Sequence, residues 1–316
     1  MDGPHRVRVL VNRVEHQADE LLQRTAAANG DRLLAKVRLA DAVDVGNWGA
    51  PYQEFAMRAH LDFLMISVAT SEPLFAVEID GARHRSGRTQ RRRDVLKDKL
   101  CKEAGLPLLR VGSDFARREG RVVLLDYLCE AYYRSIAFEA AQEAGHIPMD
   151  EVFIHWAYME TDPDSGCISL SGLDMKARAE LELLYRQKRI PHFVPDTWGG
   201  EVDGWGDLRT DVYLGVGKEL TLVGSATVRD FGGFGISAAE LSEELAILEL
   251  RQEVDRWLAG EGVAWGRPEF QSHFRAFVRE HSARCYTSSS NPNGLARIPY
   301  PPFRAEGLKI EFLESH

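Results

Sequence analysis

The chain has 316 residues, of which 44% are hydrophobic and 28% charged, and its formal net charge is −9. This length favours two domains, the composition is typical of a globular protein, and the negative charge argues against bulk attraction to nucleic acid or anionic membranes. No apolar run reaches the roughly 18 residues needed to span a bilayer, and the N-terminus lacks a signal-peptide layout, so we expect a cytoplasmic protein with no membrane partner.

The first 80 residues predict a helix followed by strands. Residues 12–28 have helical apolar spacing, and Asn12 with Glu15 fits a capping box at the start. Residues 33–40 predict a strand and residues 46–53 a loop. Two strongly apolar strands then follow, at 60–68 and 73–80, and the four residues between them indicate a hairpin.

The next segments complete a first domain. A loop at 81–90 leads into a predicted helix at 91–105 that ends at a glycine, a strand at 106–111 and a long helix at 122–145. This order predicts an α/β domain over residues 1–146. The four cysteines lack CxxC or zinc-ligand spacing, so we expect reduced thiols. They are Cys101, Cys129, Cys167 and Cys285.

Residues 147–316 predict a second, α+β domain. It holds five of the six tryptophans, with strands expected at 152–160, 209–216 and 219–228 and a helix at 238–260. The acids of the stretch DGWGDLRTD do not fit the calcium-loop spacing and are interpreted as a polar loop entering a strand. These acids are Asp203, Asp207 and Asp211. Core or interface packing is the preferred role for the tryptophans, with base stacking as the alternative; those considered are Trp198, Trp205 and Trp265.

Two carboxylates stand one residue apart at the end of a buried strand, in FAVEIDGARH. Strand alternation puts Glu78 and Asp80 on the same face, roughly 7 Å apart. Asp62, on the partner strand of the hairpin, can approach Glu78. Because a hard cation relieves both charge repulsion and desolvation, the three acids predict a Mg²⁺ or Mn²⁺ site. The alternative is that Asp80 and Gly81 form a turn and Glu78 faces solvent.

A basic loop and helix follow these acids directly. Cations beside a metal site are what phosphodiester chemistry needs, because they position phosphates and neutralise charge. Arg93 and Lys97 are four residues apart and share a helix face. The residues expected to contact nucleic acid are Arg83, Arg85, Arg88, Arg92 and Arg93. The alternative for this run is a solvated helix surface.

The ordered set LDFLMIS, LFAVEIDGARH, RRRDVLKDKLCKEAG and LPLLRV resembles the restriction-endonuclease-like, or PD-(D/E)XK, nuclease superfamily. It is most similar to the branch that includes very-short-patch-repair-like endonucleases. The resemblance covers about residues 8–130. It implies a mixed sheet flanked by helices and a divalent metal bound by Asp62 and Glu78. By the same likeness Glu15 approaches the metal, with the capping role as the alternative.

The chain departs from the superfamily pattern at one position. The usual lysine two residues after the acid is replaced by Asp80, which would bind the metal through water or order the site. A basic residue of the following helix is the expected substitute. Lys97 is the first candidate, with Arg93 or His84 as alternatives.

These observations predict a metal-dependent nuclease, acting on DNA rather than RNA, in repair, restriction or phage defence. The C-terminal domain would supply substrate choice, a protein partner surface or homodimerisation. A second hypothesis is an inactive nuclease fold that binds nucleic acid or a protein. A third is a protein–protein adaptor that works through the tryptophan-rich half.

Overall fold

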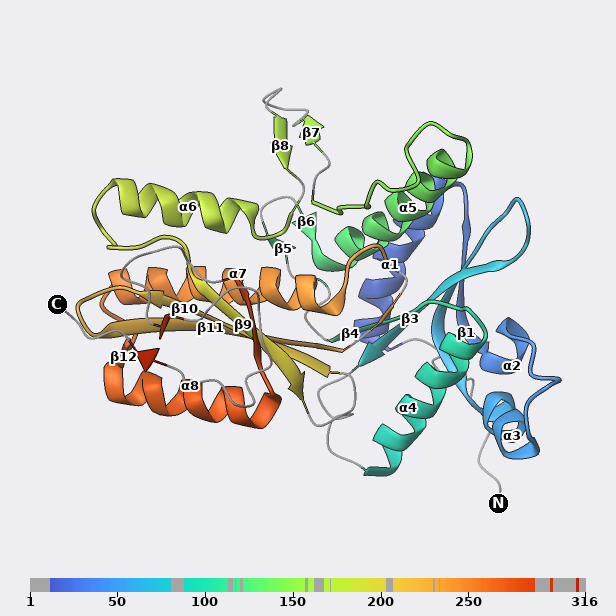
Figure 1. Cartoon of the computed structure of the whole chain (residues 1–316). Coiled ribbons are helices and arrows are strands. Elements are labelled where there is room, and N and C mark those ends of the chain that lie inside the picture. The colour runs from blue at the N-terminus through green and yellow to red at the C-terminus, as the bar shows by residue number, and fades with distance from the viewer. Residues whose placement is uncertain are drawn as a thin grey trace, which may run out of the picture. The chain divides into compact units, whose positions relative to one another are not determined.

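The computed structural model divides the chain into two compact units (Figure 1). Unit 1 comprises residues 1–153 and 231–235, and unit 2 comprises residues 154–230 and 236–316. The structure describes residues 12–80, 88–112, 116, 118–119, 122–156, 159–161, 168–170, 172–202, 207–229, 231–232, 234–287, 296–297 and 311–312. The first segment of unit 1 thus runs beyond the boundary expected at residue 146. Residues 231–235 form a second, short segment of the same unit, called the returning segment.

Unit 1 is built on a four-stranded mixed sheet of order β1-β2-β3-β4. β1–β2 and β2–β3 are antiparallel, whereas β3 and β4 are parallel and joined through a helix. The strands are β1 (Arg32–Arg38), β2 (His60–Ile66), β3 (Pro73–Asp80) and β4 (Leu108–Gly112). The helices are α1 (Arg13–Asn29), α2 (Leu39–Ala42), α3 (Ala50–Arg58), α4 (Arg88–Glu103) and α5 (Leu124–Glu143). The two-residue strands β5 (Arg118–Glu119) and β6 (Val122–Val123) form a separate ladder.

Local sequence explains the main elements of unit 1. Asn12 and Glu15 form the predicted capping box of α1, and Gly30 ends that helix in the left-handed conformation. The Ser67 N–H donates to the Glu72 carbonyl across the turn between β2 and β3, which closes the predicted hairpin. Gly105, at a φ of +72°, follows α4 and redirects the chain into β4.

Helices cover the sheet of unit 1 on both faces. One core joins residues of α2, α3 and α4 to the sheet, including Leu39, Ala56, Leu64 and Leu100. The other contains an aromatic group in which Phe75 of β3 packs against Tyr132 of α5 and against Phe234 from the returning segment, with ring centroids 4.7 and 5.3 Å away. Phe234 is fully buried, so residues 231–235 contribute to the core of unit 1.

Unit 2 contains an antiparallel five-stranded sheet of order β12-β11-β10-β9-β13. Its helices are α6 (Met175–Arg186), α7 (Ala238–Leu258) and α8 (Arg267–His281). Its sheet strands are β9 (Asp196–Val202), β10 (Asp207–Gly215), β11 (Leu220–Arg229), β12 (Trp265–Gly266) and β13 (Arg284–Thr287). Two short ladders pair β7 (Met159–Thr161) with β8 (Ile168–Leu170) and β14 (Ala296–Arg297) with β15 (Glu311–Phe312).

Successive side chains of β10 meet different helices, as strand alternation requires. The Thr210 hydroxyl hydrogen-bonds Ser242 of α7, whereas Tyr213 packs against Phe270 and Phe274 of α8. A Cβ added to Gly224 of β11 would lie 2.2 Å from the Ala246 carbonyl oxygen of α7. The sheet and α7 therefore approach too closely there for any side chain.

The prediction of an α/β chain with a mixed N-terminal sheet is confirmed. Three local predictions are wrong or incomplete. The loop expected at 46–53 becomes helical from Ala50, because Pro51 fits the first turn of a helix. The strand expected at 152–160 is limited to β7, and the start of that segment is irregular. The sequence reading also missed α6, β9 and α8.

The structure also gives the environments of two cysteines and two tryptophans. Cys101 and Cys129 are buried free thiols, and burial raises the pKa of Cys101 to about 12, so it is a poor nucleophile. Trp198 is buried in the core beneath α8, Trp265 is partly buried beside it, and Trp205 lies outside the described residues. Within the described part of the chain, no helix is long and apolar enough to cross a membrane.

Candidate active site

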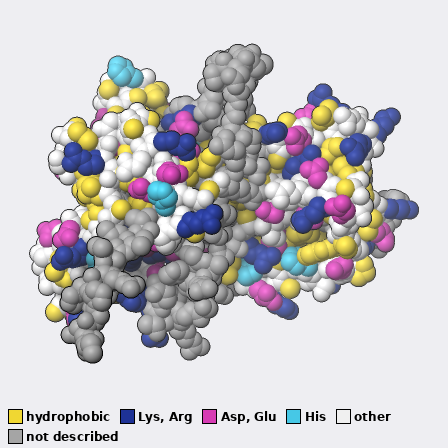
Figure 2. All heavy atoms as spheres, turned by 180° about the vertical axis from the view of Figure 1, so that it is seen from behind, with side chains coloured by type: hydrophobic (Ala, Val, Ile, Leu, Met, Phe, Trp, Pro, Cys, Tyr) yellow, Lys and Arg dark blue, Asp and Glu magenta, His cyan; other side chains and the backbone are white. Residues whose placement is uncertain are grey.

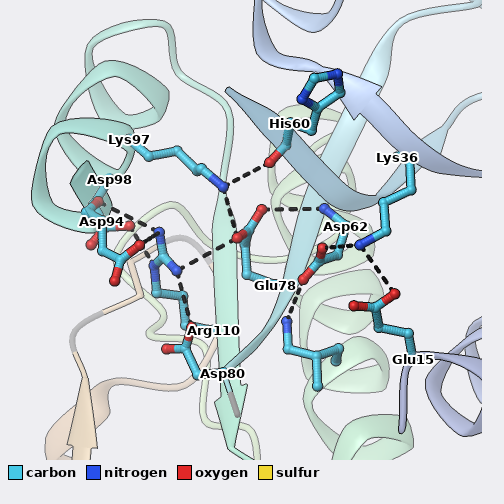
Figure 3. A network of polar contacts seen from close by, with 11 residues as sticks. Glu15, Lys36, His60, Asp62, Glu78, Asp80, Asp94, Lys97, Asp98 and Arg110 are labelled. Atoms are coloured by element: carbon cyan, nitrogen blue, oxygen red, sulfur yellow. Dashed lines mark hydrogen bonds and ion pairs between the residues drawn. The ribbon is translucent and has the colours of Figure 1, made fainter. Parts of the chain in front are cut away.

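The register of the β2–β3 hairpin brings Asp62 and Glu78 together. Phe63 pairs with Val77, so the two acids stand at the next position along the ladder. The Asp62 N–H donates to Glu78 Oε1 at 3.2 Å, and the Ile79 N–H donates to Asp62 Oδ2 at 3.0 Å (Figure 3). Each carboxylate is therefore fixed by backbone of the neighbouring strand.

Lys36 of β1 links Asp62 to Glu15 of α1. Its Nζ lies 2.6 Å from Asp62 Oδ1 and 3.1 Å from Glu15 Oε2 (Figure 3). Burial alone would lower the pKa of Lys36, but hydrogen bonds and charge from Asp62 and Glu15 raise it, so the side chain remains an ammonium. The capping role of Glu15 and its approach to the acid site are thus compatible.

The backbone of Lys36 is unusual for a strand residue. Its φ is +55°, in the left-handed region that L-residues other than asparagine and aspartate rarely adopt. The residues on either side keep the regular register with β2, Ala35 with Phe63 and Val37 with Leu61. Such backbone strain is concentrated at functional sites in proteins, and here it accompanies an ammonium between two carboxylates.

Lys97 of α4 contacts the other side of the pair. Its Nζ donates to Glu78 Oε2 at 2.8 Å and to the His60 carbonyl at 2.7 Å (Figure 3). Glu78 is 7% exposed. Burial and, to a smaller extent, the charge of Asp62 raise the pKa of Glu78, although Lys97 and Arg110 oppose this rise. The site therefore holds a carboxylate whose charge is costly unless cations lie nearby.

Arg110 of β4 organises a second group of acids beside the first. It pairs with Glu78 in the parallel register of β3 and β4. Its guanidinium lies 2.6 Å from Asp98, 3.3 Å from Asp80 and 3.6 Å from Glu78 (Figure 3). The Arg110 side chain is only 2% exposed, so these carboxylates surround a buried cation.

The structure thus brings together four of the predicted site residues: Asp62, Glu78, Glu15 and Lys97. Asp80 instead lies against Arg110, because that guanidinium extends from the paired strand between it and Asp98. Arg92 and Arg93 are exposed on α4 and contact none of these carboxylates within the described residues. Arg83, His84 and Arg85, and the side chain of Arg88, lie outside the described residues.

Sequence reasoning missed two residues of this site, Lys36 and Arg110. Both were assigned only to strands. A charged residue inside an otherwise apolar strand, as in LLAKVRL and LPLLRV, was the available signal. Such a residue is expensive to bury without a partner, so each pointed to an acid on a neighbouring strand.

The donor chemistry of the site suits a hard divalent cation. Asp62, Glu78 and Glu15 offer carboxylate oxygens, the ligands that Mg²⁺ prefers. Among the described residues, no group of three acids, histidines or cysteines is arranged to hold a metal directly. Instead the Lys36 ammonium already lies within contact distance of two of the carboxylates. A metal would therefore share or replace the contacts of that ammonium.

Only part of the chain matches a known protein family. Residues 7–123 match the family model described as "Protein of unknown function (DUF2726)". This match covers the helix, strands and α4 that carry the site, and none of unit 2. No curated protein and no solved structure matches the chain.

Proposed function

We propose that the chain is a metal-dependent phosphodiesterase that cleaves nucleic acid, DNA rather than RNA, in the cytoplasm. The observation that carries the proposal is the convergence of Asp62, Glu78 and Glu15, from three different elements, with one ammonium between Asp62 and Glu15 and a second on Glu78. Such a set of hard oxygen donors and cations suits both a divalent metal and a phosphate. The resemblance to PD-(D/E)XK nucleases supports the same reaction.

The residues of the chain would have distinct roles. Asp62 and Glu78 would hold the metal, and Glu15 would bind it directly or keep Lys36 in place. Lys97, fixed on Glu78 and on the His60 carbonyl, would position a phosphate oxygen and counter its charge. Bound Mg²⁺ would supply a more acidic water and a Lewis acid for the phosphate. Asp80 and Arg110 would hold β3 and β4 in register beneath these groups.

A second function is supported by the position of Lys36. Because its ammonium lies against two of the proposed metal ligands, part of their negative charge is already compensated without a metal. The third-motif position carries Asp80, which contacts Arg110 rather than supplying a lysine. These contacts favour, as the alternative, a nuclease fold that binds nucleic acid without cleaving it.

Cleavage assays separate the two functions. The full-length protein is incubated with supercoiled plasmid, linear duplex, single-stranded DNA and RNA, with Mg²⁺ or Mn²⁺. We expect metal-dependent cleavage that falls at least about 100-fold in Asp62→Asn and Glu78→Gln, as for loss of a group that acts in the transition state. Asp41→Asn, an exposed acid paired with Arg38, is the matched control and should keep full activity.

Two outcomes would contradict the phosphodiesterase proposal. Cleavage that is equal in the wild type and both site variants would identify a contaminating nuclease. Retained nucleic-acid binding without cleavage of any substrate would establish the binding module instead. Mn²⁺ titration calorimetry on the same proteins, with Lys36→Gln added, tests the metal directly. Removal of the competing ammonium should tighten Mn²⁺ binding, and Asp62→Asn should abolish it.

A further inference from the structure

A second group of charged side chains lies in unit 2, beneath α8. Asp211 of β10 is completely buried in the middle of the five-stranded sheet. Arg209, two residues earlier on the same face, contacts it through Nε and Nη2 at 2.8 and 3.3 Å. His273 of α8 contacts it through Nε2 at 2.9 Å, and the Tyr213 hydroxyl donates to it at 3.2 Å.

Asp211 remains ionised in this environment. Burial would raise the pKa of Asp211, but hydrogen bonds from His273 and Arg209 and the charge of Arg209 lower it. An ionised carboxylate only accepts hydrogen bonds, so the proton on His273 Nε2 is fixed toward Asp211. The other ring nitrogen, Nδ1, is left for a different partner.

The two basic side chains are adjacent to each other. Both bond Asp211 Oδ2, and both lie over the ring of Phe277. The Arg209 guanidinium carbon is 5.5 Å from the centroid of that ring, and the His273 ring lies parallel to it at 6.4 Å. Trp265 packs edge-on against His273 at 4.6 Å. The aromatic side chains and the carboxylate therefore hold both groups in one orientation.

Each basic group also has a side that reaches solvent. The Arg209 side chain is 31% exposed and that of His273 is 27% exposed, although Asp211 between them is 0% exposed. Within the described part of the chain, neither Arg209 Nη1 nor His273 Nδ1 has a hydrogen-bond partner. Neither atom is among the buried unsatisfied groups of that part, so water can reach both.

Stability alone is a poor explanation for this arrangement. A buried ion group is often no more stabilising than apolar residues of the same volume, because desolvation offsets the attraction. The surrounding core of Trp198, Tyr213, Phe270 and Phe274 is apolar and would accept such residues. A fixed carboxylate that orients two solvent-reaching donors is instead the arrangement of a preorganised binding site.

We propose that Arg209 and His273, oriented by Asp211, bind an oxyanion of the phosphate class. A guanidinium matches the geometry of phosphate oxygens, and a His273 ring that takes up a proton with the oxyanion would donate from Nδ1 while Nε2 still donates to Asp211. The oxyanion is either a free phosphate group or a phosphate of a nucleic-acid backbone. This proposal does not depend on phosphodiesterase activity in unit 1.

The test is calorimetric titration of the full-length protein with inorganic phosphate and, separately, with a short single-stranded oligonucleotide, at constant ionic strength. We expect saturable binding that weakens at least tenfold in Arg209→Gln and in His273→Gln. Both replacements keep an amide N–H for Asp211 but remove the guanidinium or the imidazole. Arg256→Gln, which removes an exposed arginine paired with Glu253, should bind like the wild type.

The titrations also identify the source of the oxyanion. Binding of inorganic phosphate alone indicates a free phosphate group, and binding of the oligonucleotide indicates a backbone phosphate. Absence of saturable binding to both, or binding that neither substitution weakens, would overturn the proposal.

A second measurement covers variants that fail to fold. Histidine-selective ¹⁵N spectra of the wild-type protein should show a phosphate-dependent shift at His273. An unchanged His273 resonance at saturating phosphate would equally refute the site.

Discussion

Arg110 is a buried cation that positions the residues of the candidate site and has no direct role in the proposed reaction. Its side chain is 2% exposed and is surrounded by Asp98, Asp80 and Glu78. Burial would lower the pKa of Arg110, but the charges of these acids raise it, so the guanidinium stays charged. Since the acids come from β3 and α4, Arg110 fixes the strand that carries Glu78 against the helix that carries Lys97.

Replacement of Arg110 should therefore destabilise the protein strongly. Arg110→Met keeps the volume but leaves the surrounding carboxylates without their cation, so we expect a loss of about 3–5 kcal/mol in the free energy of unfolding. Urea denaturation followed by circular dichroism measures this loss. Arg58→Met, which removes an exposed pair with Glu54, should change the free energy by less than about 0.5 kcal/mol. Equal effects of the two substitutions would contradict the buried-cation role.

The same physics gives Asp211 a pH dependence with a defined sign. Its pKa in the folded protein lies below the usual 3.8, so its ionised form contributes stability above pH 3.8. That contribution is lost as the pH falls through the folded-state pKa. The difference in unfolding free energy between the wild type and Asp211→Asn should therefore shrink as the pH falls below 3.8. Denaturant titrations at a series of acidic pH values check this, and a difference that grows on acidification would refute it.

At the scale of elements, β1 contains a residue whose backbone departs from ordinary strand geometry. The residues on either side of Lys36 pair in regular register with β2, yet Lys36 itself adopts a left-handed conformation within the strand. In that conformation its ammonium contacts Glu15 and Asp62. The strain and the ion pairs are thus two consequences of one local distortion.

A pair of substitutions isolates the backbone strain, because both remove the ammonium. Glycine adopts positive φ freely, so Lys36→Gly should be more stable than Lys36→Ala by about 1 kcal/mol. At Leu34 on the same strand, which is not at positive φ, the order should reverse, and alanine should be the better residue. Thermal denaturation of the four variants gives the comparison. If alanine were more stable than glycine at both positions, the backbone of Lys36 would be unstrained.

The elements that could be predicted from sequence were those with strong local signals. The capping box at Asn12 and the hairpin carrying Asp62 and Glu78 were found, and Lys97 was placed toward the acids by helical spacing. The contacts of Lys36 depend on an unusual φ angle, which no periodicity reveals. The cluster at Asp211 depends on a helix 62 residues later in the chain, and so it was interpreted only as part of a polar loop.

At the scale of the whole molecule, the described charges on the face shown in Figure 2 are of both signs. On the face shown in Figure 2, basic and acidic side chains are interspersed among hydrophobic ones in the described part of the chain. This fits the net charge of −9, which does not favour broad electrostatic attraction to a polyanion. Binding of nucleic acid would therefore depend on local sites such as those proposed.

The two units are also not separated at a single point in the sequence. Unit 1 includes residues 231–235, and Phe234 contributes a fully buried ring to its aromatic core. Phe234→Ala should therefore destabilise unit 1 by about 3–5 kcal/mol, although it lies far along the chain. Hydrogen exchange followed by mass spectrometry should show faster exchange in β3 and α5. Unchanged protection there would mean that the returning segment is dispensable. Phe193→Ala, a part-buried ring of unit 2 packed against Tyr185, is the control.

The returning segment has a consequence for the order of events during synthesis. A ribosome releases residues 1–153 well before residues 231–235, so the first unit leaves the exit tunnel with an open gap beside Phe75 and Tyr132. Its core closes only after residues 154–230, about half of the second unit, have been made. Nascent chains stalled before residue 231 should therefore be more sensitive to protease in the first 153 residues than chains stalled far enough beyond residue 235 for that segment to have left the tunnel. The fold therefore couples completion of the first unit to synthesis of the second.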